Sequence, residues 1–306
     1  MNAMTQPLPF DPASLHGLSE RLVRSHFDNN YSGAVKRLNA IRATLGETEF
    51  SNAPGFELNG LKREELVATN SMLLHELYFG SLGGDGQTME PAMKLALDAN
   101  FGGVERWREE FVATGKALGG GSGWVLLVFQ PREGTLVNQW AADHTHALAG
   151  GAPILALDMY EHAYHMDFGA AAGVYVDAFM TNIAWAQVYA RYQHAVHAAS
   201  TSFGATHDDT AGALMLDVRR AGVFETATAM IPGARWRDPG AVSTWATELP
   251  KDREVVVYCV YGHEVGRSTA MRLRAAGLKA RYLEGGINGW KAAGLPLADK
   301  AAGGAP

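Results

Sequence analysis

The chain has 306 residues, of which 47% are hydrophobic and 19% are charged, and its formal net charge is −6. This length predicts two domains, because single cores stop growing at roughly 250–300 residues. The negative charge and the absence of a Lys/Arg-rich block exclude a general nucleic-acid binder. No apolar run is long enough to cross a membrane, and residues 1–12 lack the pattern of a secretory signal. The single cysteine cannot form an internal disulfide, which favours a reducing, cytoplasmic setting.

The first two thirds of the chain predict an α+β domain over residues 1–199. Apolar residues recur at helical spacing over 15–45, and a second helix over 64–82 would complete an αα-hairpin. The remaining predicted elements are helices over 91–100 and 103–118, strands over 124–130, 135–140 and 154–158, and a final helix over 172–198.

The last third of the chain has a different pattern of apolar residues. Residues 200–212 are rich in Ser, Thr, Gly and Asp and are predicted to be a linker. Short apolar runs at 214–217, 255–259 and 280–283 then alternate with helical segments, which predicts an α/β domain with a parallel sheet over 213–300. The tail, 301–306, is predicted to be disordered.

A metal site is indicated by four residues in the first domain. Asp158 and His162 lie four apart at a strand-to-helix corner, where a carboxylate and an imidazole can converge on one ion. His26 and His75 lie in the two long helices and could face each other across the hairpin. Three imidazoles and one carboxylate suit iron, manganese or zinc.

Residues 14–198 resemble the iron/manganese superoxide dismutase family, which has a helical hairpin followed by an α/β portion. The matching segments occur in the family's order: His26 followed by Val35 and Leu38-Asn39, His75-Glu-Leu-Tyr78-Phe79, Gly121-Ser-Gly-Trp124, and Asp158-Met-Tyr-Glu-His-Ala-Tyr. The resemblance implies that His26, His75, Asp158 and His162 bind one iron or manganese ion per chain and that superoxide is the substrate.

The chain departs from the family pattern around these four residues. Ala34 replaces the gateway tyrosine and Asn30 a histidine, while Tyr160 and His165 replace a tryptophan and a tyrosine of the signature. Ser71 occupies the position of a glutamine, whose role beside the metal falls instead to His144. These changes predict retained metal binding with attenuated dismutation.

The family resemblance also implies a homodimer. Glu161 matches the glutamate that reaches the partner subunit's ligand. The other interpretation of Glu161 is an exposed carboxylate at a helix start.

Cys259 is the candidate nucleophile of the second domain. It ends the apolar run Val255–Tyr258, and a glycine-containing loop and a helical segment follow it. One interpretation is a buried strand cysteine; the other is a reactive thiol whose pKa is lowered by loop amides and a helix start.

Residues 205–298 resemble the rhodanese homology domain, which favours the reactive thiol. The matching blocks are Leu216-Asp217-Val218-Arg219, Ile231-Pro-Gly-Ala234, Cys259-x-x-Gly262 and Leu283-Glu-Gly-Gly286-Ile-x-x-Trp290. The resemblance implies that Cys259 accepts sulfur from a sulfane-sulfur donor as a persulfide, while Asp217 and Arg219 support the loop.

The active loop, Cys259–Val265, is one residue longer than in sulfurtransferases and contains Gly262, His263 and Glu264. The related phosphatase and arsenate-reductase branches need an arginine at the end of this loop. Here Val265 occupies that position, and Arg267 comes two residues later. The amino-acid sequence of the loop resembles that of rhodanese-like proteins associated with chromate resistance.

The leading hypothesis joins these two assignments: superoxide dismutation at iron or manganese, coupled in one chain to a sulfurtransferase or thiol module. Two alternatives remain open. One is a non-catalytic metal-binding scaffold with a sensing or partner-binding rhodanese module; the other is oxyanion (chromate or arsenate) detoxification at Cys259.

Overall fold

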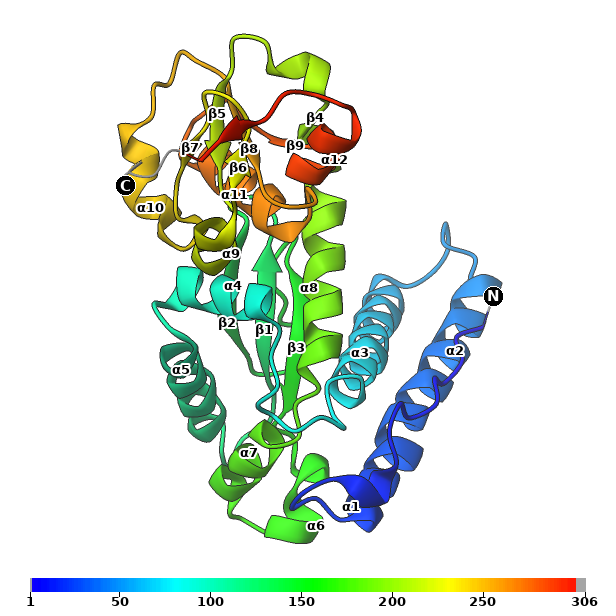
Figure 1. Cartoon of the computed structure of the whole chain (residues 1–306). Helices are drawn as coiled ribbons and strands as arrows, with labels where there is room; N and C mark the ends of the chain where they lie inside the picture. Colours follow the sequence, from blue (N-terminus) through cyan, green and yellow to red (C-terminus); the bar gives the residue numbers. More distant parts are fainter. Residues whose placement is uncertain (1, 301–306) are drawn as a thin grey trace.

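A computed structural model describes residues 2–300 and confirms the predicted fold classes (Figure 1). The tail predicted for 301–306 lies outside the described residues. In the described part of the chain, no helix is long and apolar enough to span a membrane.

The N-terminal domain begins with a helical hairpin and continues as helices around a small antiparallel sheet, in which β1 is central and pairs with both β2 and β3. Its helices are α1 (Glu20–Ser25), a π-helical stretch (His26–Tyr31), α2 (Ser32–Glu47), α3 (Gly55–Phe79), α4 (Pro91–Phe101), α5 (Val104–Ala117), α6 (His165–Phe168), α7 (Ala172–Met180) and α8 (Trp185–Ser200). Its strands are β1 (Trp124–Gln130), β2 (Thr135–Ala141) and β3 (Ala152–Asp158).

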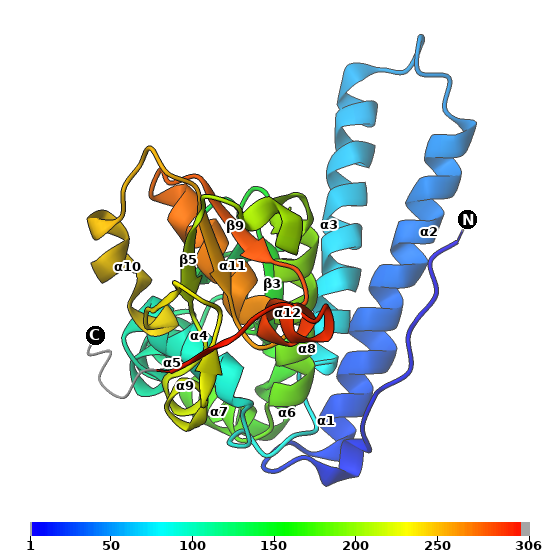
Figure 2. The ribbon, with the colours of Figure 1, turned by 45° about the horizontal axis from the view of Figure 1, so that its top comes forward.

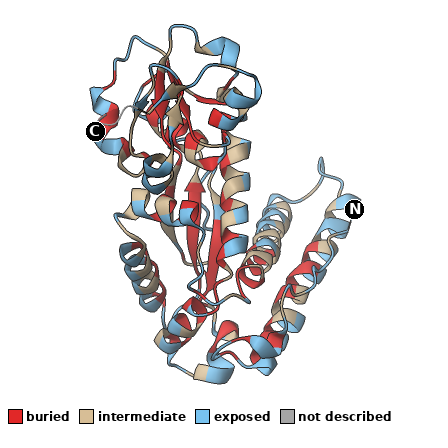
Figure 3. Cartoon of the chain, viewed as in Figure 1, coloured by how far each residue is buried: buried red, intermediate tan, exposed pale blue. Residues whose placement is uncertain are grey.

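The hairpin of α2 and α3 stands beside the rest of the molecule (Figure 2). Buried residues follow the strands of both sheets and reach the end of the hairpin where α2 begins and α3 finishes (Figure 3). His26 and His75 both lie at that buried end, with 1% of their surface exposed. The packing that closes the hairpin onto the sheet therefore also gathers its histidines.

The single helix predicted over 172–198 is two helices, α7 and α8. Between them the backbone pairs with the loop after α3 instead of continuing its helical bonds: Gly84 N donates to Asn182 O and Ala184 N donates to Ser81 O. The long-range pairing satisfies these buried backbone groups and ends the helix. The break lets α8 run along the sheet toward the C-terminal domain.

The C-terminal domain is built on a parallel five-stranded sheet of order β4-β9-β8-β5-β7. Its strands are β4 (Gly204–Ala205), β5 (Leu214–Asp217), β7 (Arg235–Trp236), β8 (Val255–Tyr258) and β9 (Ala280–Leu283); β6 (Ala229–Met230) pairs separately with β10 (Ala298–Asp299). The helices are α9 (Ala221–Thr226), α10 (Val242–Trp245), α11 (Glu264–Ala275) and α12 (Gly286–Ala292).

The segment 200–212, predicted as a linker, is instead folded. β4 forms the edge of the C-terminal sheet, and a capping box between Thr206 and Asp209 begins the short helix His207–Thr210. The Ser, Thr and Asp residues that indicated an open linker therefore form local hydrogen bonds that order the chain.

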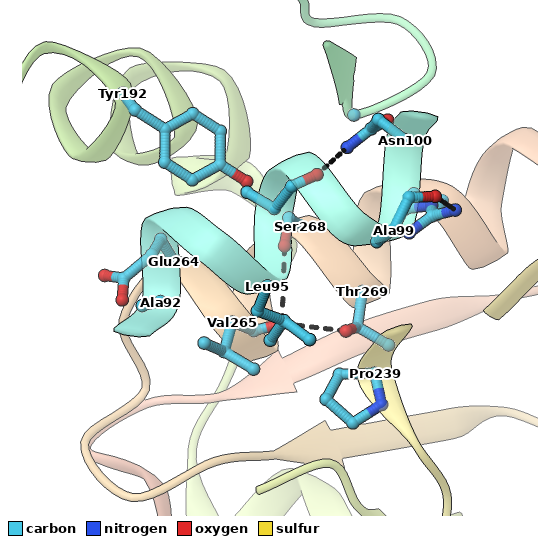
Figure 4. A pocket seen from close by; sticks show the side chains of 13 residues that line it. Ala92, Leu95, Ala99, Asn100, Tyr192, Pro239, Glu264, Val265, Ser268 and Thr269 are labelled. Carbon is cyan, nitrogen blue, oxygen red and sulfur yellow. Dashed lines mark hydrogen bonds between the residues drawn. The ribbon is translucent and has the colours of Figure 1, made fainter. Parts of the chain in front are cut away.

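The two domains pack against each other along α4, α8 and α11. Met271 of α11 belongs to the hydrophobic core of the N-terminal domain, and Arg272 Nη2 donates to Ala99 O at 3.2 Å. Side chains of α4 and α11 face each other across this seam (Figure 4). The turn between β1 and β2 also touches α11, because a Cβ added at Gly134 would lie 2.7 Å from Met271 Cβ.

This contact predicts that Gly134→Ala weakens the docking of the domains. Gly134 has φ +67°, and Gly150 has φ +71° with no atom within 4 Å of an added Cβ. Gly150→Ala is therefore the matched control, because it introduces the backbone strain alone. In urea unfolding, Gly134→Ala should lose about 1–3 kcal/mol more stability than Gly150→Ala. Equal losses of stability in the two variants would show that an added Cβ at Gly134 does not clash with α11.

Candidate functional site

Three histidines and one aspartate converge at the buried end of the hairpin. His26 opens the π-helical stretch, His75 lies in α3, Asp158 ends β3, and His162 lies in the short helix Glu161–Ala163. One side-chain nitrogen or oxygen of each lies within 4.8 Å of all the others. The structure thus brings together all four residues singled out in the sequence.

The Asp158 carboxylate is at the centre of this cluster. Its Oδ2 lies 3.1 Å from His26 Nε2, 3.5 Å from His75 Nε2 and 3.2 Å from His162 Nε2. Its Oδ1 accepts a hydrogen bond from Tyr160 N at 2.8 Å. One carboxylate oxygen is therefore fixed by the backbone, and the other faces three imidazole nitrogens.

The π-helical stretch explains how the first histidine reaches the cluster. Its hydrogen bonds join residues five apart, so His26 and Tyr31 share one face, and both are buried. The Tyr31 hydroxyl donates to Glu76 Oε1 at 2.9 Å and accepts from Gln6 N at 2.6 Å. This tyrosine, which the sequence patterns did not indicate, anchors the stretch that carries His26.

His75 is held as a neutral imidazole with Nε2 facing the cluster. Its Nδ1 lies 2.6 Å from Ser71 O, which fixes Nδ1 as the protonated nitrogen. Burial lowers the pKa of His75 to about 3. Ser71 therefore acts through its backbone carbonyl, with the hydroxyl 3.4 Å from the same ring nitrogen.

The charge states of the cluster favour a cation at its centre. Burial alone would raise the pKa of Asp158, but His162 and His26 outweigh it and hold that pKa well below its ordinary value. Burial lowers the pKa of His26, whose Nε2 is buried without a hydrogen-bond partner despite its closeness to Asp158. Because burial keeps His26 and His75 neutral, neither ring supplies the positive charge that the buried carboxylate needs.

A metal ion satisfies this arrangement. At bonds of about 2.0–2.2 Å, ligand atoms separated by angles of roughly 90–120° lie about 3–3.7 Å apart. The separations of 3.1, 3.5 and 3.2 Å around Asp158 Oδ2 and the 3.4 Å between His75 Nε2 and His162 Nε2 lie in this range. His162 is the exposed member, with 25% of its side chain accessible.

Aromatic residues pack around the cluster. Trp124 Nε1 donates to His144 Nδ1 at 3.0 Å, and the rings of His144 and His75 are 6.2 Å apart. Tyr160 stacks on both His144 and His162, at centroid distances of 4.7 and 5.4 Å. Trp124, His144 and Tyr160 thus lie beside the cluster.

The other residues singled out around the metal site lie at its periphery. Ala34 is buried in α2 and contributes only a methyl group, and Asn30 lies half-buried in the π-helical stretch. Glu161 and His165 are exposed. Tyr175, which no sequence pattern indicated, donates its hydroxyl to Asp158 O at 2.8 Å.

Cys259 follows β8 and is 6% exposed. Backbone amides of Gly266, Tyr261, Gly262 and His263 donate toward its sulfur and favour the thiolate. Burial nevertheless outweighs them and raises the pKa of the thiol. The lowered pKa predicted from the loop and helix start is therefore wrong, because that prediction did not include the desolvation of the sulfur.

Two glycines allow the active loop to pack tightly. Gly262 has φ +71°, and a Cβ there would lie 2.7 Å from Leu283 O. A Cβ at Gly286 would lie 2.5 Å from Cys259 O. Gly286, the first residue of α12, therefore provides the space in which the cysteine loop lies.

The charged side chains near the thiol are bound to other groups. Both Glu264 oxygens accept hydrogen bonds from α8, and Arg267 Nε donates to Gly262 O at 2.9 Å while its guanidinium stacks on Tyr282 at 4.1 Å. Arg219 forms a buried ion pair with Asp217. Arg267 is thus not available to hold an anion above Cys259. Asp217 accepts a hydrogen bond at 3.0 Å from the hydroxyl of Tyr258, the residue before Cys259.

Two family models match the chain, one in each domain. The model "Iron/manganese superoxide dismutases, C-terminal domain" matches residues 89–191, and the rhodanese-like domain model matches residues 204–293.

Similar proteins cover the N-terminal domain. A protein of Cupriavidus metallidurans named superoxide dismutase [Fe] is 65% identical over 191 residues, which are 62% of this chain and 96% of that protein. Superoxide dismutase [Fe] of Aquifex pyrophilus is 34% identical over 61% of this chain and 90% of its own length. Superoxide dismutase [Mn] 2 of Haloferax volcanii is 34% identical over 64% of this chain and 98% of its own length.

The raised pKa of Cys259 predicts slow reaction at neutral pH. Alkylation by iodoacetamide should be at least about tenfold slower than in the urea-unfolded chain, and its rate should keep rising above the pH at which an ordinary thiol has ionised. Mass spectrometry of samples in which alkylation is stopped at successive times gives the rate at each pH for the folded and for the unfolded chain. If the alkylation rate of the folded chain levels off at a pH below that at which an ordinary thiol ionises, burial does not raise the pKa of Cys259.

Proposed function

Because this chain belongs to the iron/manganese superoxide dismutase family, we propose that its N-terminal domain dismutates superoxide at one iron or manganese ion. The proposed ligands are His26, His75, Asp158 and His162. Two observations support the proposal: Oδ2 of the buried Asp158 lies 3.1, 3.5 and 3.2 Å from three imidazole nitrogens, and His26 Nε2 has no hydrogen-bond partner. Iron is favoured over manganese, because the relative named as an iron enzyme shares 65% identity and the manganese relative 34%.

The residues around the proposed ion have separate tasks. When bound, the ion supplies one-electron oxidation and reduction. Asp158 provides negative charge that favours a trivalent over a divalent ion, and the Ser71 carbonyl orients His75 and increases its basicity. The buried ligands lie behind His162, so superoxide approaches past the His162 and Tyr160 rings.

Peroxide formation consumes protons, and His144 is the proposed group that helps to deliver them. Its Nδ1 accepts the Trp124 hydrogen bond, so the neutral ring carries its proton on Nε2. Ala34 offers no hydroxyl for this purpose. We therefore retain the expectation of attenuated dismutation, and Ala34→Tyr is expected to raise the rate.

The exposed positions of Glu161 and His165 are compatible with the homodimer that the family resemblance implies. In that dimer, Glu161 would face the partner subunit's metal site. The assembly would also cover the exposed edge of His162.

For the C-terminal domain, we propose sulfur transfer at Cys259. The rhodanese-like match and the amides directed at the sulfur support a persulfide there. Arg267 is bound to Gly262 O and stacked on Tyr282, so it does not supply the positive charge that phosphoryl transfer needs around the transferred group.

The metal proposal predicts that Asp158→Ala abolishes metal binding. Removing the one anionic ligand should reduce bound iron or manganese from about one per chain to near zero and remove the thermal stabilisation by metal. Superoxide dismutation, followed by pulse radiolysis on samples of known metal content, should be lost with it. Asp177→Ala is the control, because Asp177 is an exposed carboxylate paired with Lys116.

Equal metal content and stabilisation in the two variants would overturn the ligand assignment. Wild-type protein fully loaded with metal but without dismutation would instead favour the non-catalytic scaffold.

The sulfur-transfer proposal predicts one persulfide per chain after treatment with thiosulfate. Mass spectrometry should show an added sulfur atom on Cys259 and none in Cys259→Ser. Formation should accelerate with rising pH, because the raised thiol pKa limits the thiolate fraction. No sulfur adduct, together with Cys259-dependent reduction of chromate or arsenate, would replace sulfur transfer by oxyanion chemistry.

A further inference from the structure

The cavity beside Cys259 has walls from both domains. It encloses about 320 Å³, and the cysteine loop, Arg219 and Arg220 line its C-terminal side. Its opposite wall consists of residues 90–92, where α4 begins, and Tyr189 of α8. The metal-binding domain therefore forms part of the space in front of the thiol.

A buried carboxylate clamps the cysteine loop to this wall. Glu264, 5% exposed, accepts a hydrogen bond from the Tyr189 hydroxyl at 2.7 Å and another from Gln193 Nε2 at 3.0 Å. Tyr189 and Gln193 lie four residues apart and so share one face of α8. Both carboxylate oxygens are thereby bound to the N-terminal domain, which stabilises an otherwise costly buried charge.

The clamp acts on the part of the loop that surrounds the sulfur. Glu264 directly follows His263, whose amide donates toward Cys259. Two further contacts connect the same region to α8: the rings of His263 and His197 are 5.8 Å apart, and Arg267 Nη1 donates to Ser200 Oγ at 3.2 Å. Residues 263, 264 and 267, at the end of the loop and in the first turn of α11, thus all contact α8 of the N-terminal domain.

We propose that the metal domain completes the thiol site: Glu264 is a positioning residue, and the wall of Tyr189 and residues 90–92 restricts Cys259 to small-molecule sulfur donors and acceptors. The cavity is at the lower end of the usual size of small-ligand sites, about 300–1,000 Å³. It holds a small sulfane-sulfur anion or a low-molecular-weight thiol and excludes the cysteine-bearing segment of a folded partner protein. This inference rests on the sulfur transfer proposed above.

The chemistry balances with a donor of the thiosulfate class. Cys259 loses its proton to solvent, and the thiolate attacks the outer sulfur of the donor. A new S–S bond forms while the donor's S–S bond breaks, and sulfite leaves with the bonding electron pair. A small thiolate then attacks the outer sulfur of the persulfide, which restores the Cys259 thiolate.

The size limit can be measured without sulfur transfer. In the full chain, Cys259 is alkylated with iodoacetamide and with a maleimide carrying a polyethylene glycol chain, and each rate is divided by that in urea-unfolded protein. In wild type the bulky reagent should be slowed at least about tenfold more than the small one. Tyr189→Ala should remove most of this difference, whereas Gln187→Ala, on the exposed side of the same helix, should retain it.

The positioning role of Glu264 has its own measurement. Glu264→Ala should lower the maximal rate of persulfide formation from thiosulfate about tenfold or more, with a smaller change in the half-saturating concentration. Glu264→Gln should restore much of the rate, because an amide can still bond Tyr189 and Gln193. Gln193→Ala, compared with Gln187→Ala, repeats the test without altering the loop.

Equal slowing of the two reagents in folded wild type would overturn the size limit. Thiosulfate turnover unchanged in Glu264→Ala would overturn the positioning role. Absence of any persulfide with the alkylation difference intact would instead refute sulfur transfer, while leaving the two-domain cavity established.

Discussion

The arrangement of the N-terminal domain depends on one buried carboxylate. Asp158 ends the third strand, is fully buried, and has one oxygen fixed by the Tyr160 amide while the other faces three imidazoles. Isolated charges are expensive to bury, so this group demands a compensating cation. The hairpin supplies His26 and His75 to the same point, and closing the hairpin on the sheet and assembling the cluster are therefore one event.

Helix α8 connects this domain to the thiol domain. It runs from the sheet of the first domain to the C-terminal domain (Figure 1). There Tyr189 and Gln193 bind Glu264 of the active loop. In the structure both Glu264 oxygens face α8, so its charge holds the domains together. The rhodanese-like domain forms its own sheet, but the N-terminal domain supplies one wall of the cavity beside Cys259.

The sequence predicted the features that depend on local pattern or on known motifs. The two fold classes, the three strands of the first sheet and the convergence of four dispersed residues follow from periodicity and family signatures. The interrupted helix at residues 181–184 and the folded segment 200–212 did not, because distant backbone partners decide both. The Cys259 pKa depends on the burial of the sulfur, and the Glu264 contacts depend on the packing of the two domains. Residue spacing in one sequence displays neither.

If the buried cluster is a metal site, four side chains from separate elements bind one ion. Anomalous X-ray scattering, measured on either side of the iron and manganese absorption edges from crystals of the metal-reconstituted full-length chain, locates that ion. We expect one strong peak per chain among His26, His75, Asp158 and His162, with the edge identifying the metal. Fully reconstituted crystals with no peak there, or with the peak at another group of residues, would contradict this assignment.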